Sequence, residues 1–374
     1  MQHYRSFCIY DKCGGFCAIT LPKAPPRLIV FSMILRPKSL SRNSGALPGA
    51  TTAMSAILVP TWLRRAVPDA QGVAGKDIED VALAAGAAIG ALDAVVRRQE
   101  RWAGAWRQRL ALTAAAATVR QAGRVEDEPA LRDAMLLARP GDILSGSTTL
   151  GPAGSMLLAW RRLAGTSAEK LLTEASISAV LDDLGLRRED DAVGELANDL
   201  RQLSADMGMV GMLTGAFTAA ERYGFAQAFG FWLADALLAQ RMGWEHAVPL
   251  LGGEAALGTS VRPRRSAAVA TSIETNPERA KSILVAQARA AVRGIDLSAE
   301  LERRANRLLA VAPKLRAKAA DAVVEKLLSD DAIVASEKIA GMSDRGLRRL
   351  FDRLVELGAV RELSGRPTFR IYGL

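Results

Sequence analysis

The sequence predicts a mainly α-helical protein, in which an all-α helical body is followed by a small C-terminal module that mixes helices and strands. Hydrophobic residues make up 49% of the 374 residues and aromatic residues only 5%, a balance that favours helices over sheets. Apolar residues recur three and four positions apart through most of the chain, which is the period of a helix packed on one face. Strand signals are sparse before residue 355.

The length and the distribution of charge divide the chain. A chain of 374 residues is long enough for one large body and a small module. The net charge of +9 is +6 over residues 1–53, −5 over 54–261, +8 over 262–318 and zero over 319–374. Such segregation favours an anionic partner for the basic part. We expect four parts: a leader (1–53), an all-α body (54–260), a basic linker with a helix (261–320) and a C-terminal module (321–374).

Residues 1–53 have the composition of a leader. The three cysteines, Cys8, Cys13 and Cys17, lie there, and because their spacing fits neither a zinc site nor an iron–sulfur loop we expect no metal. The apolar run Leu28–Leu35 is far shorter than the ~20 residues of a membrane helix, so no membrane association is expected. We expect this segment to be disordered or to precede the natural start at Met54. The cysteine-free remainder fits a reducing cytoplasm.

Helical periodicity defines the body. Thr166 and Glu169 have the spacing of a capping box before one of its helices, and Gly123 is suited to end another. The expected helices span residues 77–99, 101–123, 130–142 and 170–185.

The deepest core is expected between residues 203 and 240, where apolar side chains lie nearly all round the helices. Such helices are either buried or span a membrane. Because Glu221, Arg222 and Asp235 interrupt the stretch, we expect burial. Gly211 and Gly215 predict a close approach between helices.

The composition changes after residue 260. Residues 261–281 are rich in arginine and contain two prolines, which predicts a basic linker or hinge. A helix is expected from about Ser298 to Ala312, ending at Pro313.

Catalytic chemistry finds little support. The chain has two histidines, His3 and His246, so a multi-histidine metal centre is excluded. The glycine-rich stretch Gly141–Ser155 places Pro152 where a phosphate-binding loop needs lysine, so it fails as a nucleotide site. An enzyme with a pocket near Trp244–His246 is a weaker hypothesis than the DNA-binding and protein-interaction roles considered below. No cofactor is expected.

The C-terminal module is the best-specified part of the sequence. Residues 321–330 and 335–341 are expected to form helices, and Ser343 is placed to cap a longer helix that ends at Leu357, before Gly358. Its apolar stripe contains Leu347, Leu350, Phe351, Leu354 and Leu357. Residues 359–363 and 368–374 are expected to be strands joined by a tight turn over residues 364–367.

The stretch "GMSDRGLRRLFDRLVELGAVRELSGRPTFRIY" resembles bacterial winged helix-turn-helix modules, over roughly the last 55 residues. The resemblance implies that 343–357 is a recognition helix and that this is a cytoplasmic protein that binds double-stranded DNA. A homodimer would engage two half-sites on the DNA. Arginine suits this work because its planar fork donates two hydrogen bonds to a guanine edge or a phosphate. The expected DNA-binding residues are Arg345, Arg348, Arg349, Arg353 and Arg366.

Three acids on the same helix, Asp344, Asp352 and Glu356, dilute its positive field. The alternative hypothesis is therefore a helical interaction or scaffold protein, whose winged helix docks a protein partner.

Most of residues 54–374 also resembles a bacterial family, domain of unknown function 1403. The stretches that carry this resemblance are "GAAIGALDAVVRRQERWAGAWRQRLALTAAAATVRQAGR" and "LRRLFDRLVELGAVRELSGRPTFRIYGL". The resemblance is consistent with a start at Met54 and implies no particular activity or ligand.

Overall fold

The computed structural model describes residues 59–67, 76–137, 151–186, 190–254, 277–317, 319–366 and 368–374. The contacts between Cα atoms group the chain into two units, Met1–Met54 and Ser55–Leu374, and every described residue belongs to the second. The expectations for the leader, its cysteines and the arginine-rich stretch 261–276 therefore lie outside the described residues.

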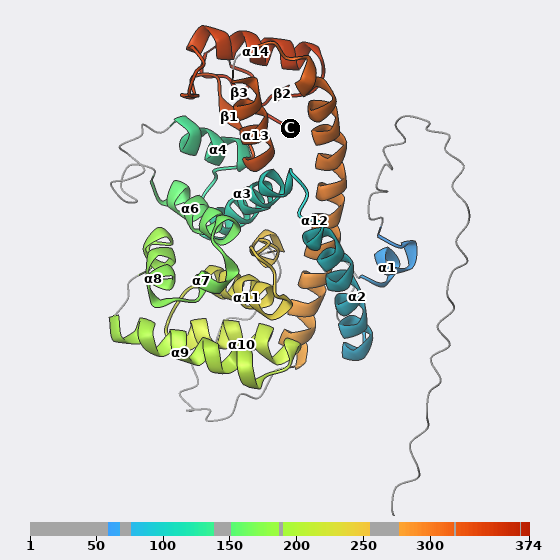
Figure 1. Ribbon diagram of the computed structural model, residues 1–374. Coiled ribbons are helices and arrows are strands. Elements are labelled where there is room, and N and C mark those ends of the chain that lie inside the picture. Colours follow the sequence, from blue (N-terminus) through green and yellow to red (C-terminus); the bar gives the residue numbers. More distant parts are fainter. Residues whose placement is uncertain are drawn as a thin grey trace, which may run out of the picture. The chain divides into compact units, whose positions relative to one another are not determined.

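The protein is mainly helical, with one small sheet (Figure 1). Within the described ranges, no helix combines the length and the apolar character that crossing a membrane requires. The elements are α1 (Thr61–Ala66), α2 (Ile78–Arg97), α3 (Ala103–Gln121), α4 (Glu128–Leu137), α6 (Gly151–Gly165), α7 (Ala168–Leu171), α8 (Glu174–Asp183), α9 (Asp190–Asp206), α10 (Met209–Arg222), α11 (Gln227–Met242), the 3₁₀ helix η1 (Leu251–Glu254), α12 (Pro277–Val311), the 3₁₀ helix η2 (Ala312–Lys314), α13 (Ala320–Ser329), β1 (Ile333–Val334), α14 (Asp344–Glu356), β2 (Arg361–Glu362) and β3 (Ile371–Gly373).

The body is built from pairs of packed helices. α2 packs along α12, α3 packs on α6, and α10 packs on α11 (Figure 1). As expected, α10 and α11 carry much of the core, and every residue from Phe229 to Ala239 is buried. A Cβ atom on Gly215 would lie 2.4 Å from a methyl carbon of Leu203, so this glycine does allow a close approach between α10 and α9.

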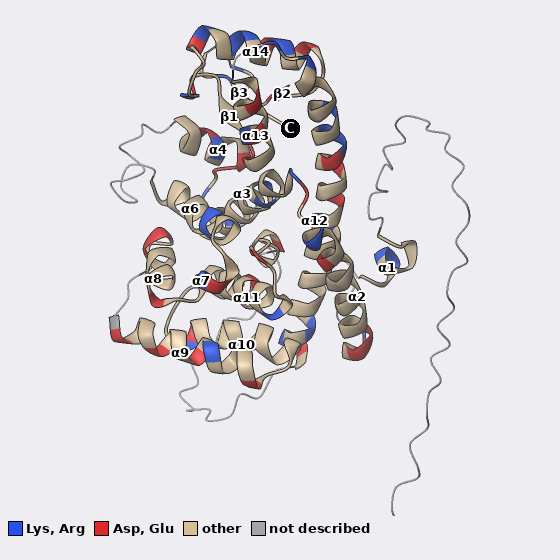
Figure 2. Cartoon of the chain, viewed as in Figure 1, with Lys and Arg blue, Asp and Glu red and all other residues tan. Residues whose placement is uncertain are grey.

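α12 begins much earlier than the sequence analysis expected, at Pro277 instead of about Ser298. From Pro277 onward the basic residues are interspersed with buried apolar residues such as Ile283, Ala291 and Ile295, so this part of the chain is an amphipathic helix. Figure 2 shows basic and acidic residues interspersed along its length. Trp106 Nε1 donates a hydrogen bond of 2.9 Å to the Gly294 carbonyl, which ties α12 to α3.

Residues 166–185 also differ from expectation. They form two helices, α7 and α8, instead of one, because the Thr173 hydroxyl accepts a hydrogen bond of 3.3 Å from Ser176 N and starts a new helix there. The expected capping box at Thr166 does not form, since Ser167 is the N-cap residue of α7 and its side chain makes no capping bond.

A buried carboxylate organises the centre of the body. Asp235 on α11 is fully buried and accepts hydrogen bonds from Leu250 N at 2.7 Å and Leu251 N at 3.0 Å, so it caps η1. Next in the chain, Gly252 leaves no room for a side chain, because a Cβ atom there would lie 2.3 Å from the ring of Trp160. The capped turn is thus wedged between α11 and the α3–α6 pair.

The C-terminal subdomain, residues 320–374, consists of α13, α14 and a three-stranded antiparallel sheet. The strand order is β1-β3-β2, with Ile333 opposite Tyr372 and Arg361 opposite Gly373. Phe351 of α14 stacks on Tyr372 of β3 with the ring centroids 4.3 Å apart, so the helix covers the sheet.

Three details of this subdomain were not predicted correctly. The segment 335–341 is a series of turns and not a helix, because Ala335 N donates to Arg370 O and so extends the pairing that β1 begins. β1 itself was not expected, and the two expected strands are shorter than the sequence indicated.

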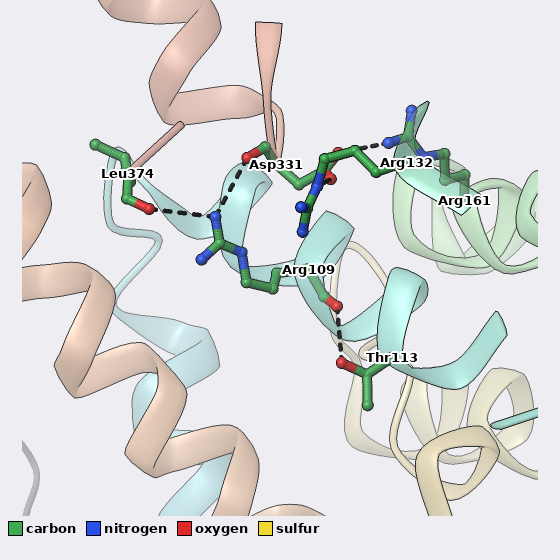
Figure 3. A network of polar contacts seen from close by, with 6 residues as sticks. All are labelled: Arg109, Thr113, Arg132, Arg161, Asp331 and Leu374. Carbon is green, nitrogen blue, oxygen red and sulfur yellow. Dashed lines mark hydrogen bonds and ion pairs between the residues drawn. The ribbon is translucent and has the colours of Figure 1, made fainter. Parts of the chain in front are cut away.

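A network of arginines fastens this subdomain to the body (Figure 3). Asp331, between α13 and β1, is 1% exposed, and its carboxylate receives Arg161 at 2.5 Å and Arg132 at 3.2 Å. Arg109 donates from the other side to the main-chain oxygens of Asp331 and Leu374, both at 3.3 Å. Three body helices, α3, α4 and α6, thus converge on one short segment.

Replacing Asp331 should loosen the subdomain from the body. Asp331→Ala leaves two largely buried guanidinium groups without their carboxylate, and removing one partner of a buried pair costs about 3–5 kcal/mol. We expect a loss of that size in the free energy of unfolding by urea. The exposed Asp321→Ala, on α13, should lose less than about 1 kcal/mol. Equal losses for the two variants would contradict the network's role.

The buried Asp235 should leave a signature in the pH dependence of stability. Burial raises the pKa of its carboxyl well above the usual range. The native state then holds the proton more tightly than the unfolded chain, so stability from this group is greatest at acid pH and falls as the pH rises toward the raised pKa.

Asp235→Asn keeps an oxygen for the two N–H groups but cannot ionise. The difference in free energy of unfolding, Asp235→Asn minus the unmodified protein, should therefore increase as the pH rises from about 4 to about 8. Urea unfolding at both pH values measures this, and a constant difference would refute it. Asp235→Ala should be less stable at both pH values, because the buried N–H groups lose their acceptor at about 1–3 kcal/mol each.

Candidate nucleic-acid interface

α14 has the cap, stripe and termination that the sequence predicted. The Ser343 hydroxyl accepts a hydrogen bond of 3.2 Å from Gly346 N and caps the helix. Leu347, Leu350, Phe351 and Leu354 are buried, whereas Leu357 is partly exposed. Gly358 adopts a left-handed conformation with φ of 64° after the last turn. The helix therefore has one buried face and one face that is open to solvent.

Arg345, Arg348 and Arg349 lie on the open face, in the N-terminal half of the helix. At three- and four-residue spacings they project opposite the buried stripe. Within the part of the chain that the structure describes, none of the three forms an ion pair. Figure 2 shows basic residues along α14 at the outer edge of the subdomain.

The remaining predicted arginine of this helix, Arg353, is partly neutralised. Its guanidinium lies 2.6 Å from Glu356, and Asp352 faces Arg370 of the β2–β3 segment at 3.9 Å. Two of the three acids that dilute the helix are thus engaged near its C-terminal end. The third, Asp344, is in the first turn, where a carboxylate stabilises the helix. The positive charge consequently concentrates at the N-terminal half.

Arg366 is not brought together with the helix arginines. It lies 2.6 Å from Asp133 of α4, whose carboxylate is largely buried, and so it contacts the body. Arg366, one of the five predicted DNA-binding residues, therefore helps to hold the subdomain on the body, as Asp331 does.

Basic residues of α12 lie next to this subdomain, although none of them was named individually as an expected DNA-binding residue. Arg304 donates a hydrogen bond of 3.0 Å to the Leu374 main-chain oxygen, so this part of α12 adjoins the end of β3. Its neighbours Arg303 and Arg307 are exposed. These residues fall within the helix expected from about Ser298 to Ala312 and within the basic stretch 262–318.

A second candidate lies in the body, where the sequence placed its pocket. A cleft of about 570 Å³ opens beside Trp244 and His246, between the start of α3 and Ser329 at the end of α13. Burial lowers the pKa of His246, and the nearby Arg107 lowers it further. The imidazole is therefore neutral at neutral pH.

The cleft lacks the geometry of a nucleophilic site. His246 Nδ1 lies 4.0 Å from Glu245 Oε1, beyond hydrogen-bond distance. The hydroxyl of Ser329 donates to the Lys326 carbonyl at 3.2 Å. Because no activated hydroxyl or thiol is placed on the imidazole among the described lining residues, the cleft is better suited to binding than to acyl transfer.

Comparison with known proteins places the chain in a family. Neither a curated protein nor a solved structure matches it. A family model described as "Protein of unknown function (DUF1403)" matches residues 49–374, which is most of the chain. The resemblance found in the sequence is confirmed, and the chain belongs to the DUF1403 family.

Proposed function

We propose that the C-terminal subdomain is a winged helix that binds double-stranded DNA, with α14 as its recognition helix. The order of elements supports this: α13, β1, α14 and the β2–β3 hairpin follow one another as the helices and wing of such a module do. The segment 335–341 departs from the pattern, because turns replace its middle helix.

The observation that carries the proposal is the cluster of Arg345, Arg348 and Arg349, exposed and without ion pairs among the described residues. In helix-turn-helix proteins the N-terminal residues of the recognition helix contact the base edges. The free arginines of α14 occupy that half of the helix, while its acids lie mainly in the other half. At 13 residues, α14 is about 20 Å long, which suits a major groove about 12 Å wide.

The exposed basic residues of α12 extend this surface. Arg303 and Arg307 lie near the subdomain because Arg304, between them, contacts Leu374. Phosphate contacts from such residues orient a protein on DNA without reading its sequence. A homodimer would add a second half-site and so raise the affinity of a small reading helix.

A protein partner is the second candidate, favoured by exposed apolar side chains in the same subdomain. Phe369 is 67% exposed, and Val355 and Leu357 are also exposed. Phe369 has a positive φ of 55°, a conformation that costs a non-glycine residue of order 1–3 kcal/mol. Within the described residues the ring of this strained residue stays exposed, which supports a contact with a partner.

Binding of the full chain to random-sequence duplex DNA tests the proposal. We expect the logarithm of the affinity to fall linearly with the logarithm of the salt concentration, by about 0.9 per phosphate contact. The triple variant R345E/R348E/R349E should bind at least about 100-fold more weakly and reduce the salt slope by about three. Fluorescence anisotropy across a salt series measures both quantities.

The matched control is K170E/R120E/R201E, which changes the net charge equally at three exposed positions of the body that form no ion pair among the described residues. It should bind DNA almost as the unmodified protein does. Urea unfolding should show that both triple variants remain folded. Absence of DNA binding at low salt, or equal losses of DNA affinity in the two triple variants, would contradict the DNA proposal and favour the protein partner.

A further inference from the structure

The cleft beside Trp244 and His246 takes no part in the proposed DNA contact. We propose that it binds a small anion bearing a carboxylate or a phosphate group, through the guanidinium of Arg107. Its volume of about 570 Å³ lies within the range of ~300–1,000 Å³ that is usual for small-molecule sites.

Arg107 reaches the cleft from α3 with both terminal amino groups of its guanidinium still available. Its Nε donates a hydrogen bond of 3.0 Å to the Ala164 carbonyl behind it. Its two terminal amino groups have no hydrogen bond or ion pair to the residues that the structure describes. A planar fork of this kind matches the paired oxygens of a carboxylate or a phosphate.

The charge of Arg107 is poorly compensated where it stands. Burial lowers the pKa of the guanidinium, and only Glu245 acts in the opposite direction. Glu245 acts on it through its charge alone, with no direct bond to Arg107, and its Oε2 accepts a hydrogen bond of 3.2 Å from Gln99 Nε2. An anion entering the cleft would supply the missing partner in a partly desolvated place, where charge-assisted hydrogen bonds are strongest.

The other basic groups of the cleft are already engaged. Arg97 bonds to Asp93 at 2.8 Å and to the Met242 carbonyl at 2.9 Å, and Arg101 pairs with Glu325 of α13. The acids offset their charges, so these two arginines do not compete with Arg107 for the bound group. The neutral imidazole of His246 can donate one further hydrogen bond.

Two features of the backbone agree with a binding site here. The cleft wall contains Ala103 and Gly104, the first residues of the 19-residue helix α3, whose positive end favours an anion. Gln99 adopts a positive φ of 46°, and strained conformations of this kind concentrate at functional sites.

Calorimetric titration of the full chain with inorganic phosphate, and separately with succinate, tests the site. We expect saturable binding of at least one of them, and which one binds identifies a phosphate or a carboxylate ligand. Arg107→Gln should weaken that binding by about tenfold or more, because a bond to a charged group is lost. Arg120→Gln, an exposed change on the same helix, should leave it unaltered.

Two further measurements guard against a variant that misfolds and against binding elsewhere. Ala103→Phe retains Arg107 but fills the cleft, so it should also weaken binding. Hydrogen exchange should show protection by the bound ion at residues 98–107 and 243–246. The proposal is overturned if neither ion binds saturably, if Ala103→Phe and Arg107→Gln both bind normally, or if protection appears only on α14.

Discussion

The carboxylate of Asp331 determines where the C-terminal subdomain sits, and the orientation of α14 depends on it. Arg132 and Arg161 converge on this group from two helices, while Arg109 holds the main-chain oxygens of Asp331 and Leu374 at one end of the β1–β3 pair. A buried ion pair contributes little net stability, since desolvation offsets most of the attraction. It does penalise every arrangement that separates the partners. We infer that the network selects one docking geometry among several that would bury similar apolar area.

That geometry explains why the arginines of the chain divide into two groups. The arginines at the junction, including Arg366 with Asp133, are paired with groups of the other part and hold the subdomain on the body. The apolar stripe of α14 packs on the sheet, as the stacking of Phe351 on Tyr372 shows, and this leaves the opposite face open. A face presented by a helix that is fixed on both its sheet and the body is preorganised, so a partner would not have to order it on binding.

The sequence predicted α14 because its signals are local. It did not predict the features that depend on contacts between distant residues. The Ser343 cap, the apolar stripe and Gly358 are all readable within 16 residues, and the structure has all three. The role of Asp331 could not be recognised, because its arginine partners lie 170 and 199 residues away in the sequence. The role of Asp235 depends on how a turn 15 residues later folds back onto α11. The early start of α12 was missed because its arginines resemble a hinge in composition, although their spacing is helical. Residues 335–341 have helical propensity but do not form a helix, and Ala335 N at their start donates instead to Arg370 O.

The pairing of arginines is the criterion that separates structure from function in this protein. Each buried or bridging guanidinium at the junction has an acceptor that explains its position, as Arg304 has in Glu300 and Leu374. Arg345, Arg348 and Arg349 have none among the described residues, and Arg107 uses only its Nε. Water solvates the three exposed guanidinium groups at little cost, so their stability does not require a partner. Only a binding measurement can test what their clustering on one half of α14 is for. Arg107 is partly buried, where an uncompensated charge is costly. Of the two sets, the single arginine in the cleft is therefore the more desolvated.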